Sequence, residues 1–156
     1  MNDELTNEAY EALSKYRQER AHETLEEIPF LREKGYYGTA INRLYYACYY
    51  AALAMLAKHH IASSTHSGVK TLLGLHFVSK GLVSKESGRA FSNLYDSRQR
   101  GDYDEFVYAT LEEVDELNFQ ALEESTKFLQ RFSVWSSYYH VEIEKQTDNR
   151  SHSPKQ

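Results

Sequence analysis

Residues 37–60 read YGTAINRLYYACYYAALAMLAKHH, and this stretch decides the fold class of the 156-residue chain. Its apolar side chains recur at three- and four-residue spacing, which is the period of an α-helix. Apolar residues nearly encircle that helix, which indicates a central position in a helical bundle. The most apolar part, residues 41–57, is too short to span a bilayer. Small residues leave room for a neighbouring helix to approach closely: Ala47, Ala51 and Ala54.

The segment before this helix predicts another helix over residues 4–34. Its apolar stripe is weak and includes Leu13 and Tyr16. Pro29 either kinks or breaks the helix, because proline removes a backbone donor. Gly35 then ends it.

Two shorter helices are expected after residue 60, each opened by a residue type that caps helix N-termini. The first begins after Ser64 or Thr65 and ends at Gly81. The second begins after Ser84 and is interrupted at Gly101.

The last expected helix opens with the capping box TLEE at residues 110–113 and extends to about Lys145. Residues 146–156 are polar and predict a disordered tail. No segment alternates with a period of two, so no sheet is expected. The sequence therefore predicts a single all-α domain over residues 1–145, followed by that tail.

Composition restricts the function classes. The formal net charge of −5 argues against nucleic-acid binding through bulk charge, although a local basic cleft remains possible. The single cysteine, Cys48, lies in the most apolar helix, which favours an inert buried thiol in a reducing compartment. No signal peptide is visible, so a cytoplasmic protein that is not in a membrane is expected. The chain has no P-loop, dinucleotide-binding glycine pattern or nucleophile elbow.

A metal site is weakly suggested and is not the favoured interpretation. Glu19 and His22 form one Glu-x-x-His motif, but a di-iron bundle needs two such motifs. The sequence His22-Glu-x-x-Glu26 lacks the second histidine of the H-E-x-x-H zinc pattern. A charged, solvated helix face explains these residues better, so no metal or cofactor is expected.

Residues 91–103, FSNLYDSRQRGDY, contain the strongest candidate for a functional site. Arg98 extends the inward-facing apolar stripe of this helix. A guanidinium there must be paired or must line a cleft, since an unpaired buried charge is costly. Asp102 can accept from Arg98 if the helix continues, whereas Arg100 lies on another face and can pair with Asp96.

Three motifs resemble the HEPN (higher eukaryotes and prokaryotes nucleotide-binding) domain family. Residues 35–47, GYYGTAINRLYYA, are similar to its g-x-Y-x-x-A-x-x-R-x-Y-Y-A signature. Residues 66–69, HSGV, are similar to the H-x-G-V opening of the next helix. Residues 98–103, RQRGDY, resemble the R-x-x-a-D-Y motif of one HEPN branch. The motifs occur in the expected order, and the resemblance covers about residues 10–132.

The resemblance implies an up-and-down antiparallel bundle of four to five helices that forms a homodimer, with Arg98 near the dimer cleft. Many HEPN proteins are metal-independent ribonucleases with an Arg-x4–6-His motif, and some are toxins paired with a small nucleotidyltransferase antitoxin. Here the positions for that histidine hold Tyr103, Asp104 and Glu105. Tyrosine is a poor proton shuttle at neutral pH because its pKa is near 10. His66, from another helix, is the alternative proton carrier.

The favoured hypothesis is a HEPN module that binds a nucleotide, RNA or a nucleotidyltransferase partner and is not clearly catalytic. Its ligand site would contain Arg98, Asp102, Tyr103, Arg43 and His66. For Arg43, however, a structural ion pair with an acidic residue of the first or fourth helix is favoured over ligand binding. One alternative is a metal-independent ribonuclease toxin that uses Arg98 with His66 or Tyr103. The other is a structural dimerisation protein.

Overall fold

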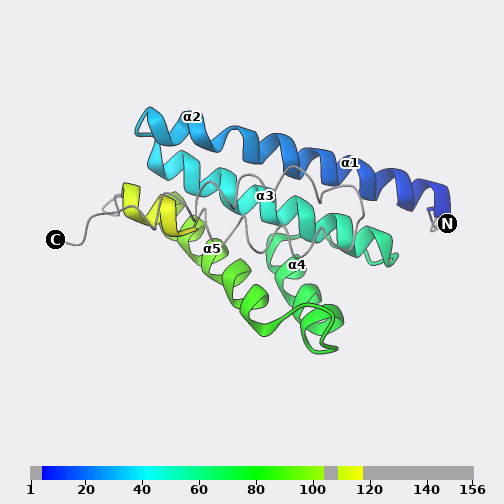
Figure 1. Cartoon of the computed structure of the whole chain (residues 1–156). Helices are drawn as coiled ribbons and strands as arrows, with labels where there is room; N and C mark the ends of the chain where they lie inside the picture. Colours follow the sequence, from blue (N-terminus) through cyan, green and yellow to red (C-terminus); the bar gives the residue numbers. More distant parts are fainter. Residues whose placement is uncertain (1–4, 104–108, 118–156) are drawn as a thin grey trace.

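The computed structural model describes residues 5–103 and 109–117, and every regular element in these residues is helical (Figure 1). The predicted all-α class is therefore confirmed. The elements are α1 (Asn7–Glu26), α2 (Ile28–Glu33), α3 (Tyr37–Lys58), α4 (His66–Leu73), a π-helical turn (Gly74–Val78) and α5 (Lys85–Tyr103). Residues 111–117 are also helical. The rest of the expected last helix and the 146–156 tail lie outside the described residues.

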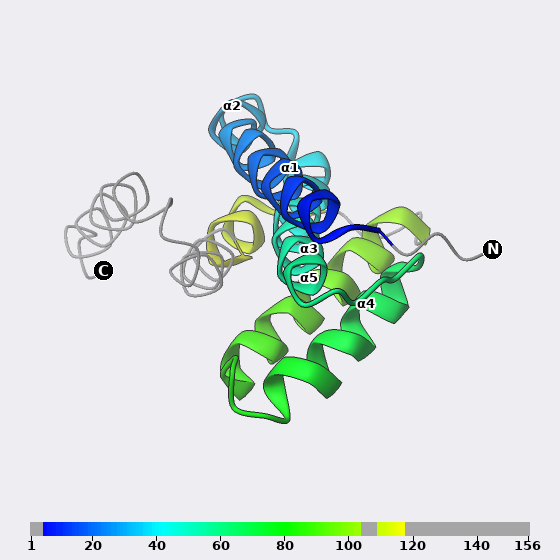
Figure 2. The same cartoon turned by 90° about the vertical axis from the view of Figure 1, so that its right-hand side faces the viewer.

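Helix α3 lies between two layers of helices. Helix α1 runs antiparallel to it on one side, and α4 and α5 pack on the other side (Figures 1 and 2). Because both sides are covered, α3 buries residues along nearly its whole length, from Ala40 to Ala57. This explains the nearly continuous apolar sequence of the helix. Within the described part of the chain, no helix combines the length and apolar character needed to cross a membrane.

Small residues bring α1 and α3 close together. The Ser14 hydroxyl is buried and donates a 2.9 Å hydrogen bond to the backbone carbonyl of Ala54. The Arg17 guanidinium donates to the carbonyl of Leu53 at 3.0 Å. Side chains of α1 can reach these main-chain oxygens because the short side chains of the α3 alanines do not cover them. The expected apolar stripe of α1 is partly wrong, since Tyr16 is 57% exposed. The buried residues of α1 are mostly small or polar: Ser14, Ala21, Thr24 and Leu25.

The first expected helix is broken rather than kinked. Helix α1 ends at Glu26, and Pro29 lies in the first turn of α2, where its missing N–H is not needed. Gly35 has a φ of 77°, a left-handed conformation that glycine adopts without steric cost, and it follows the end of α2. Helix α2 is joined to the 111–117 helix by a bidentate ion pair between Arg32 and Asp115, at 2.5 and 2.9 Å.

The expected capping residues open their helices. Thr65 accepts from the Gly68 N–H at 3.0 Å. Ser84 accepts from the Ser87 N–H at 3.0 Å, just before α5. Thr110 accepts from the Glu113 N–H at 3.1 Å. Each side chain satisfies a backbone donor that the first turn leaves without an intrahelical partner.

Two helix ends differ from the prediction. Helix α4 ends at Leu73 and continues as the π-helical turn, whereas Gly81, with a φ of 69°, lies in the following loop. Gly101 does not interrupt α5, which continues to Tyr103. A glycine inside a helix costs only about 1 kcal/mol relative to alanine, which packing elsewhere can offset.

Replacing Ala54 by leucine should lower the free energy of unfolding by about 1–3 kcal/mol, because the larger side chain enters the close contact between α1 and α3. Urea denaturation measures the change. Ala12→Leu adds the same atoms at an exposed position of α1 and should change stability by less than about 0.5 kcal/mol. Equal losses in both variants would contradict close packing at Ala54.

Candidate functional site

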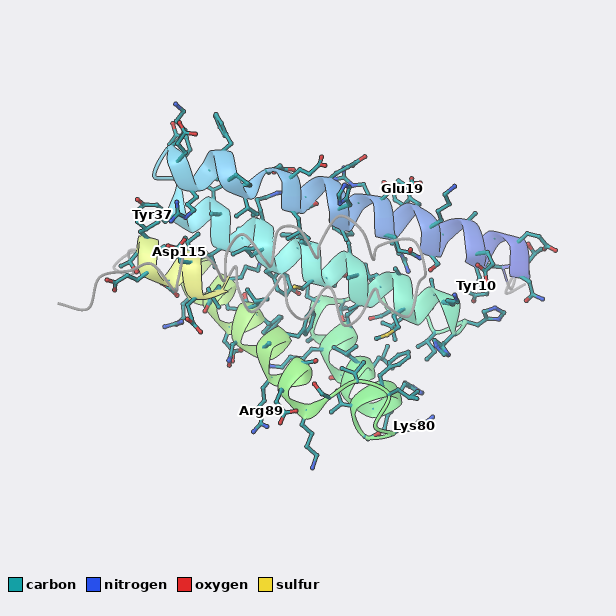
Figure 3. All side chains as sticks on the ribbon, in the orientation of Figure 1. Tyr10, Glu19, Tyr37, Lys80, Arg89 and Asp115 are labelled. Atoms are coloured by element: carbon teal, nitrogen blue, oxygen red, sulfur yellow. The ribbon has the colours of Figure 1, made fainter. Side chains whose placement is uncertain are left out.

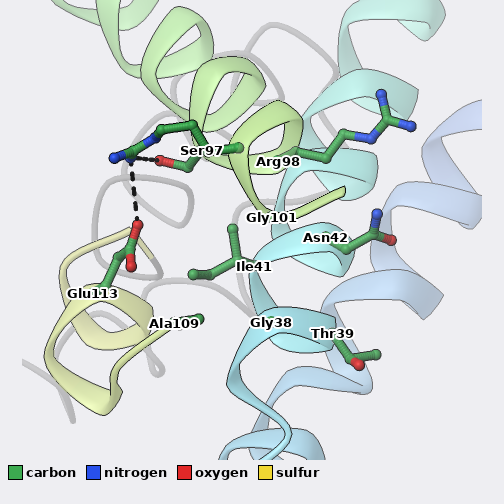
Figure 4. Close-up of a pocket in the computed structure, with 10 residues that line it drawn as sticks. Gly38, Thr39, Ile41, Asn42, Ser97, Arg98, Gly101, Ala109 and Glu113 are labelled. Carbon is green, nitrogen blue, oxygen red and sulfur yellow. Dashed lines mark hydrogen bonds and ion pairs between the residues drawn. The ribbon is translucent and has the colours of Figure 1, made fainter. Parts of the chain in front are cut away.

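Arg98 projects from α5 toward the tyrosines of α3. Its guanidinium carbon lies 5.4 Å from the ring centroid of Tyr45 and 5.5 Å from that of Tyr46. Both distances fall within the range of cation–π attraction. In Figure 4 its side chain extends away from Glu113, on the same side as Asn42. The side chain is half-buried between the two helices, so it is neither fully enclosed nor freely solvated.

His66, the first residue of α4, lies against the same tyrosines. Its ring stacks on Tyr49 with centroids 4.4 Å apart and meets Tyr46 edge-on at 5.6 Å. Its Nδ1 is 2.9 Å from the Tyr45 hydroxyl oxygen. Arg98 and His66, which are 32 positions apart in the sequence, are therefore brought to one surface of α3. These two residues and the three tyrosines that they contact form one set, which we call the Arg98–His66 site: Tyr45, Tyr46, Tyr49, His66 and Arg98.

Burial and a nearby positive charge both disfavour the protonated form of His66. Burial, followed by the positive charge of Arg98, lowers the pKa of His66 from its ordinary value. Burial also raises the pKa of Tyr45, whose hydroxyl therefore keeps its proton near neutral pH. Tyr45 and His66 can each be the donor in their shared hydrogen bond. If Tyr45 donates, the neutral imidazole carries its proton on Nε2 and can donate to a ligand.

Arg43 lies beside this site but has a structural partner. It forms a bidentate ion pair with Glu27, the residue that follows α1, with distances of 2.8 and 3.0 Å. This is the kind of ion pair that the sequence favoured over ligand binding. The Arg43 guanidinium also lies 5.9 Å from the centre of the Tyr46 ring. Tyr46 therefore contacts Arg43, Arg98 and His66.

A hollow of about 430 Å³ adjoins the other side of Arg98 (Figure 4). Arg100 lies at its edge, donates to the Ser97 hydroxyl at 3.1 Å and is 3.6 Å from Glu113. The expected pair between Arg100 and Asp96 is wrong, because Asp96 lies 3.6 Å from Lys70 instead. The hollow is lined by Gly38, Thr39, Ile41, Asn42, Ser97, Arg98, Arg100, Gly101, Ala109 and Glu113.

Two predicted site residues are placed only by their backbone. Asp102 and Tyr103 lie on the last turn of α5, about one turn beyond Arg98, and their side chains lie outside the described part.

The sequence did not single out Tyr45 and Tyr49 as partners of His66. Their four-residue spacing places them on one helix face, but tyrosines in an apolar helix are usually core residues.

The residues considered as metal ligands are separate from this site. Glu19 is exposed on the outer side of α1 (Figure 3), and His22 pairs with Glu26 at 3.1 Å. The described residues contain no cluster of three or more histidine, cysteine, aspartate or glutamate side chains able to hold a metal ion. Cys48 is buried in α3.

The family model of the HEPN domain matches residues 14–141. The chain therefore belongs to the HEPN domain family, as its motifs suggested. It is 35% identical over 97 residues to a "UPF0332 protein" from Thermotoga maritima, covering 62% of this chain and 74% of that protein. Two proteins from Methanocaldococcus jannaschii, each named "Putative toxin", are also similar. One is 34% identical over 54% of this chain and 63% of its own length. The other is 29% identical over 64% of this chain and 67% of its own length.

Replacing Arg98 by glutamine should raise the pKa of His66, because a positive charge that disfavours the imidazolium is removed. The pKa should stay below the ordinary value, since burial is the larger cause. NMR titration of the His66 ring protons measures it. Arg100→Gln removes a charge that is bonded to Ser97 and should leave this pKa nearly unchanged. An unaltered titration in the Arg98 variant would contradict the electrostatic coupling.

Proposed function

We propose that this HEPN protein binds RNA through its phosphate groups at the Arg98–His66 site and acts as the toxin member of a toxin–antitoxin pair. One observation carries the proposal: Tyr45 and Tyr46 hold both a permanently charged guanidinium and a neutral imidazole. Arginine is the side chain best suited to phosphate oxygens. A neutral His66 with its proton on Nε2 adds a donor without adding charge.

The surroundings favour RNA over an isolated anion. Tyr46 and Tyr49 are half-buried at the edge of the site, where an unpaired base can contact an aromatic ring. Such binding is local and is compatible with a net charge of −5. Asp102 and Tyr103 are expected to border the bound strand, because they follow Arg98 by about one helical turn. Arg43 remains paired with Glu27 and contributes to the site by holding the ring of Tyr46 in place.

Cleavage of the bound RNA is the second candidate, and the neutral state of His66 favours it. In this reaction the ribose 2′-hydroxyl attacks the adjacent phosphorus and His66 Nε2 takes the hydroxyl proton. The P–O5′ bond breaks, the leaving oxygen takes a proton from water, and the hydroxide so formed takes the proton from His66, which returns to its neutral state. The products are a 2′,3′-cyclic phosphate and a 5′-hydroxyl. Arg98 would offset the charge that develops on the phosphate oxygens. This route needs the tautomer in which His66 Nδ1–H donates to Tyr45.

Two protein partners belong to the proposal. The name "Putative toxin" of the Methanocaldococcus jannaschii relatives supports an inhibitory partner. A small nucleotidyltransferase is the expected type, as the HEPN motifs imply. A homodimer is expected too, with Arg98 near the shared cleft, and the many tyrosines of the chain suit such an interface.

Arg98→Ala should weaken binding of a fluorescent single-stranded RNA by about 10- to 100-fold, because a hydrogen bond to a charged group contributes about 1.5–3 kcal/mol. Fluorescence anisotropy in the presence of chelator measures it, and gel analysis of the same samples detects cleavage. Arg100→Ala removes the same charge from the other face of α5 and should have a much smaller effect.

The outcomes separate the candidate functions. Cleavage by the wild type that is lost in Arg98→Ala and in His66→Ala supports the ribonuclease. Binding without cleavage supports a binding module. If neither RNA binding nor cleavage is found, and Arg98→Ala converts a dimer to a monomer in sedimentation velocity, Arg98 is structural and the proposal is wrong.

A further inference from the structure

A second hollow lies on the arm formed by α4, the π-helical turn and α5. Its volume is about 400 Å³. Leu73 and Phe91, almost fully buried, contribute to its floor together with Val78. The hollow is lined by Lys70, Leu73, Gly74, Val78, Lys85, Gly88, Arg89, Phe91 and Ser92. We call it the arm groove.

The charged residues that line the arm groove are all basic. Lys70, Lys85 and Arg89 line it, and none of its described lining residues is acidic. Glu86 and Asp96 pair with Arg89 and Lys70, at 3.0 and 3.6 Å, but neither of these acids lines the groove. A basic rim on a chain with a net charge of −5 is a local feature that favours an acidic ligand.

The backbone keeps the groove open at one point and narrow at another. A Cβ atom added to Gly74 would meet no atom within 4 Å. A Cβ atom added to Gly88 would lie 3.0 Å from Val78, so α5 and the π-helical turn approach closely there. The turn itself runs from Gly74 to Val78. π-Helical turns are rare and frequently occur at functional sites.

We propose that the arm groove binds an acidic amphipathic helix of a partner protein. Apolar side chains on one face of that helix would contact Leu73, Val78 and Phe91, and its carboxylates would pair with the basic rim. Leu75, in the π-helical turn, and Leu82, in the loop that follows it, are 59% and 37% exposed. Nucleic acid is disfavoured, because a phosphate backbone would leave the apolar floor without a matching group.

The arm groove is separate from the Arg98–His66 site but shares α4 with it. Helix α4 begins at His66 and supplies Lys70 and Leu73 to the groove. The Lys70 ammonium also lies 4.9 Å from the centre of the Tyr95 ring, which packs against Tyr45. A partner in the groove would therefore lie close to the site without occupying it. The binding itself does not depend on RNA binding.

The test uses the full chain and a designed helical peptide of about 16 residues, with leucine at i, i+3, i+4 and i+7 and glutamate elsewhere. A matched peptide carries lysine in place of glutamate. The acidic peptide should shift the NMR amide signals of Gly74, Val78 and Gly88, and the basic peptide should not. The binding constant comes from the titration of these shifts.

Gly74→Trp fills the groove at a position whose φ of −60° and ψ of −48° suit any residue, so the fold should be retained. It should weaken acidic-peptide binding at least tenfold. Gly38→Trp is the matched control, because Gly38 is also helical and has no atom within 4 Å of an added Cβ. Lys85→Glu weakens binding through charge alone and provides a second variant.

Four results would each overturn the proposal. They are no shifts with the acidic peptide, equal binding of both peptides, equal binding to the Gly74→Trp variant, and shifts confined to other residues. A single-stranded RNA that shifts the same three amides would identify the groove as a nucleic-acid surface instead. Loss of RNA binding in Arg98→Ala leaves these outcomes unchanged, so the two proposals fail separately.

Discussion

The position of α3 between two helical layers is the constraint on which the rest of the structure depends. On one side its alanines allow α1 to approach until Ser14 reaches the carbonyl of Ala54. On the other side the ring of Tyr45 packs against His66 of α4 and against Phe91 and Tyr95 of α5. The two contacts leave Tyr46 and Tyr49 only partly covered, at the edges of the helix. The site is built on those edges.

Much of the fold follows from the sequence because helices leave local signals. The period of α3 and the caps at Thr65, Ser84 and Thr110 depend on residues within one or two turns of each other. The predictions that fail concern features that depend on contacts between residues far apart in the sequence. Tyr16 was expected on the inward face because of its spacing from Leu13, yet α1 buries mostly small and polar residues against α3. No local pattern predicts the π-helical turn.

The site was only half predictable for the same reason. Spacing along α5 places Arg98 on the inward face, and the structure agrees. Spacing along α5 cannot identify the residues that Arg98 contacts or lies near, because Tyr45 and His66 belong to two other helices. The hydrogen bond between them joins residues that are 21 positions apart. The HEPN motifs marked these residues through resemblance, whereas helical periodicity alone would have assigned the tyrosines to the core.

The charge arrangement has a consequence for ligand binding. Without a ligand, Arg98 and burial both disfavour protonated His66. A phosphate bound at the Arg98–His66 site would place negative charge close to both side chains, offset the charge of Arg98 and favour the imidazolium. The same phosphate would stabilise the imidazolium that forms when His66 takes the 2′-hydroxyl proton in the proposed cleavage. In the proposed ribonuclease, a histidine from another helix would then move the proton although the usual position holds none, and the hydrogen bond to Tyr45 would keep its imidazole oriented.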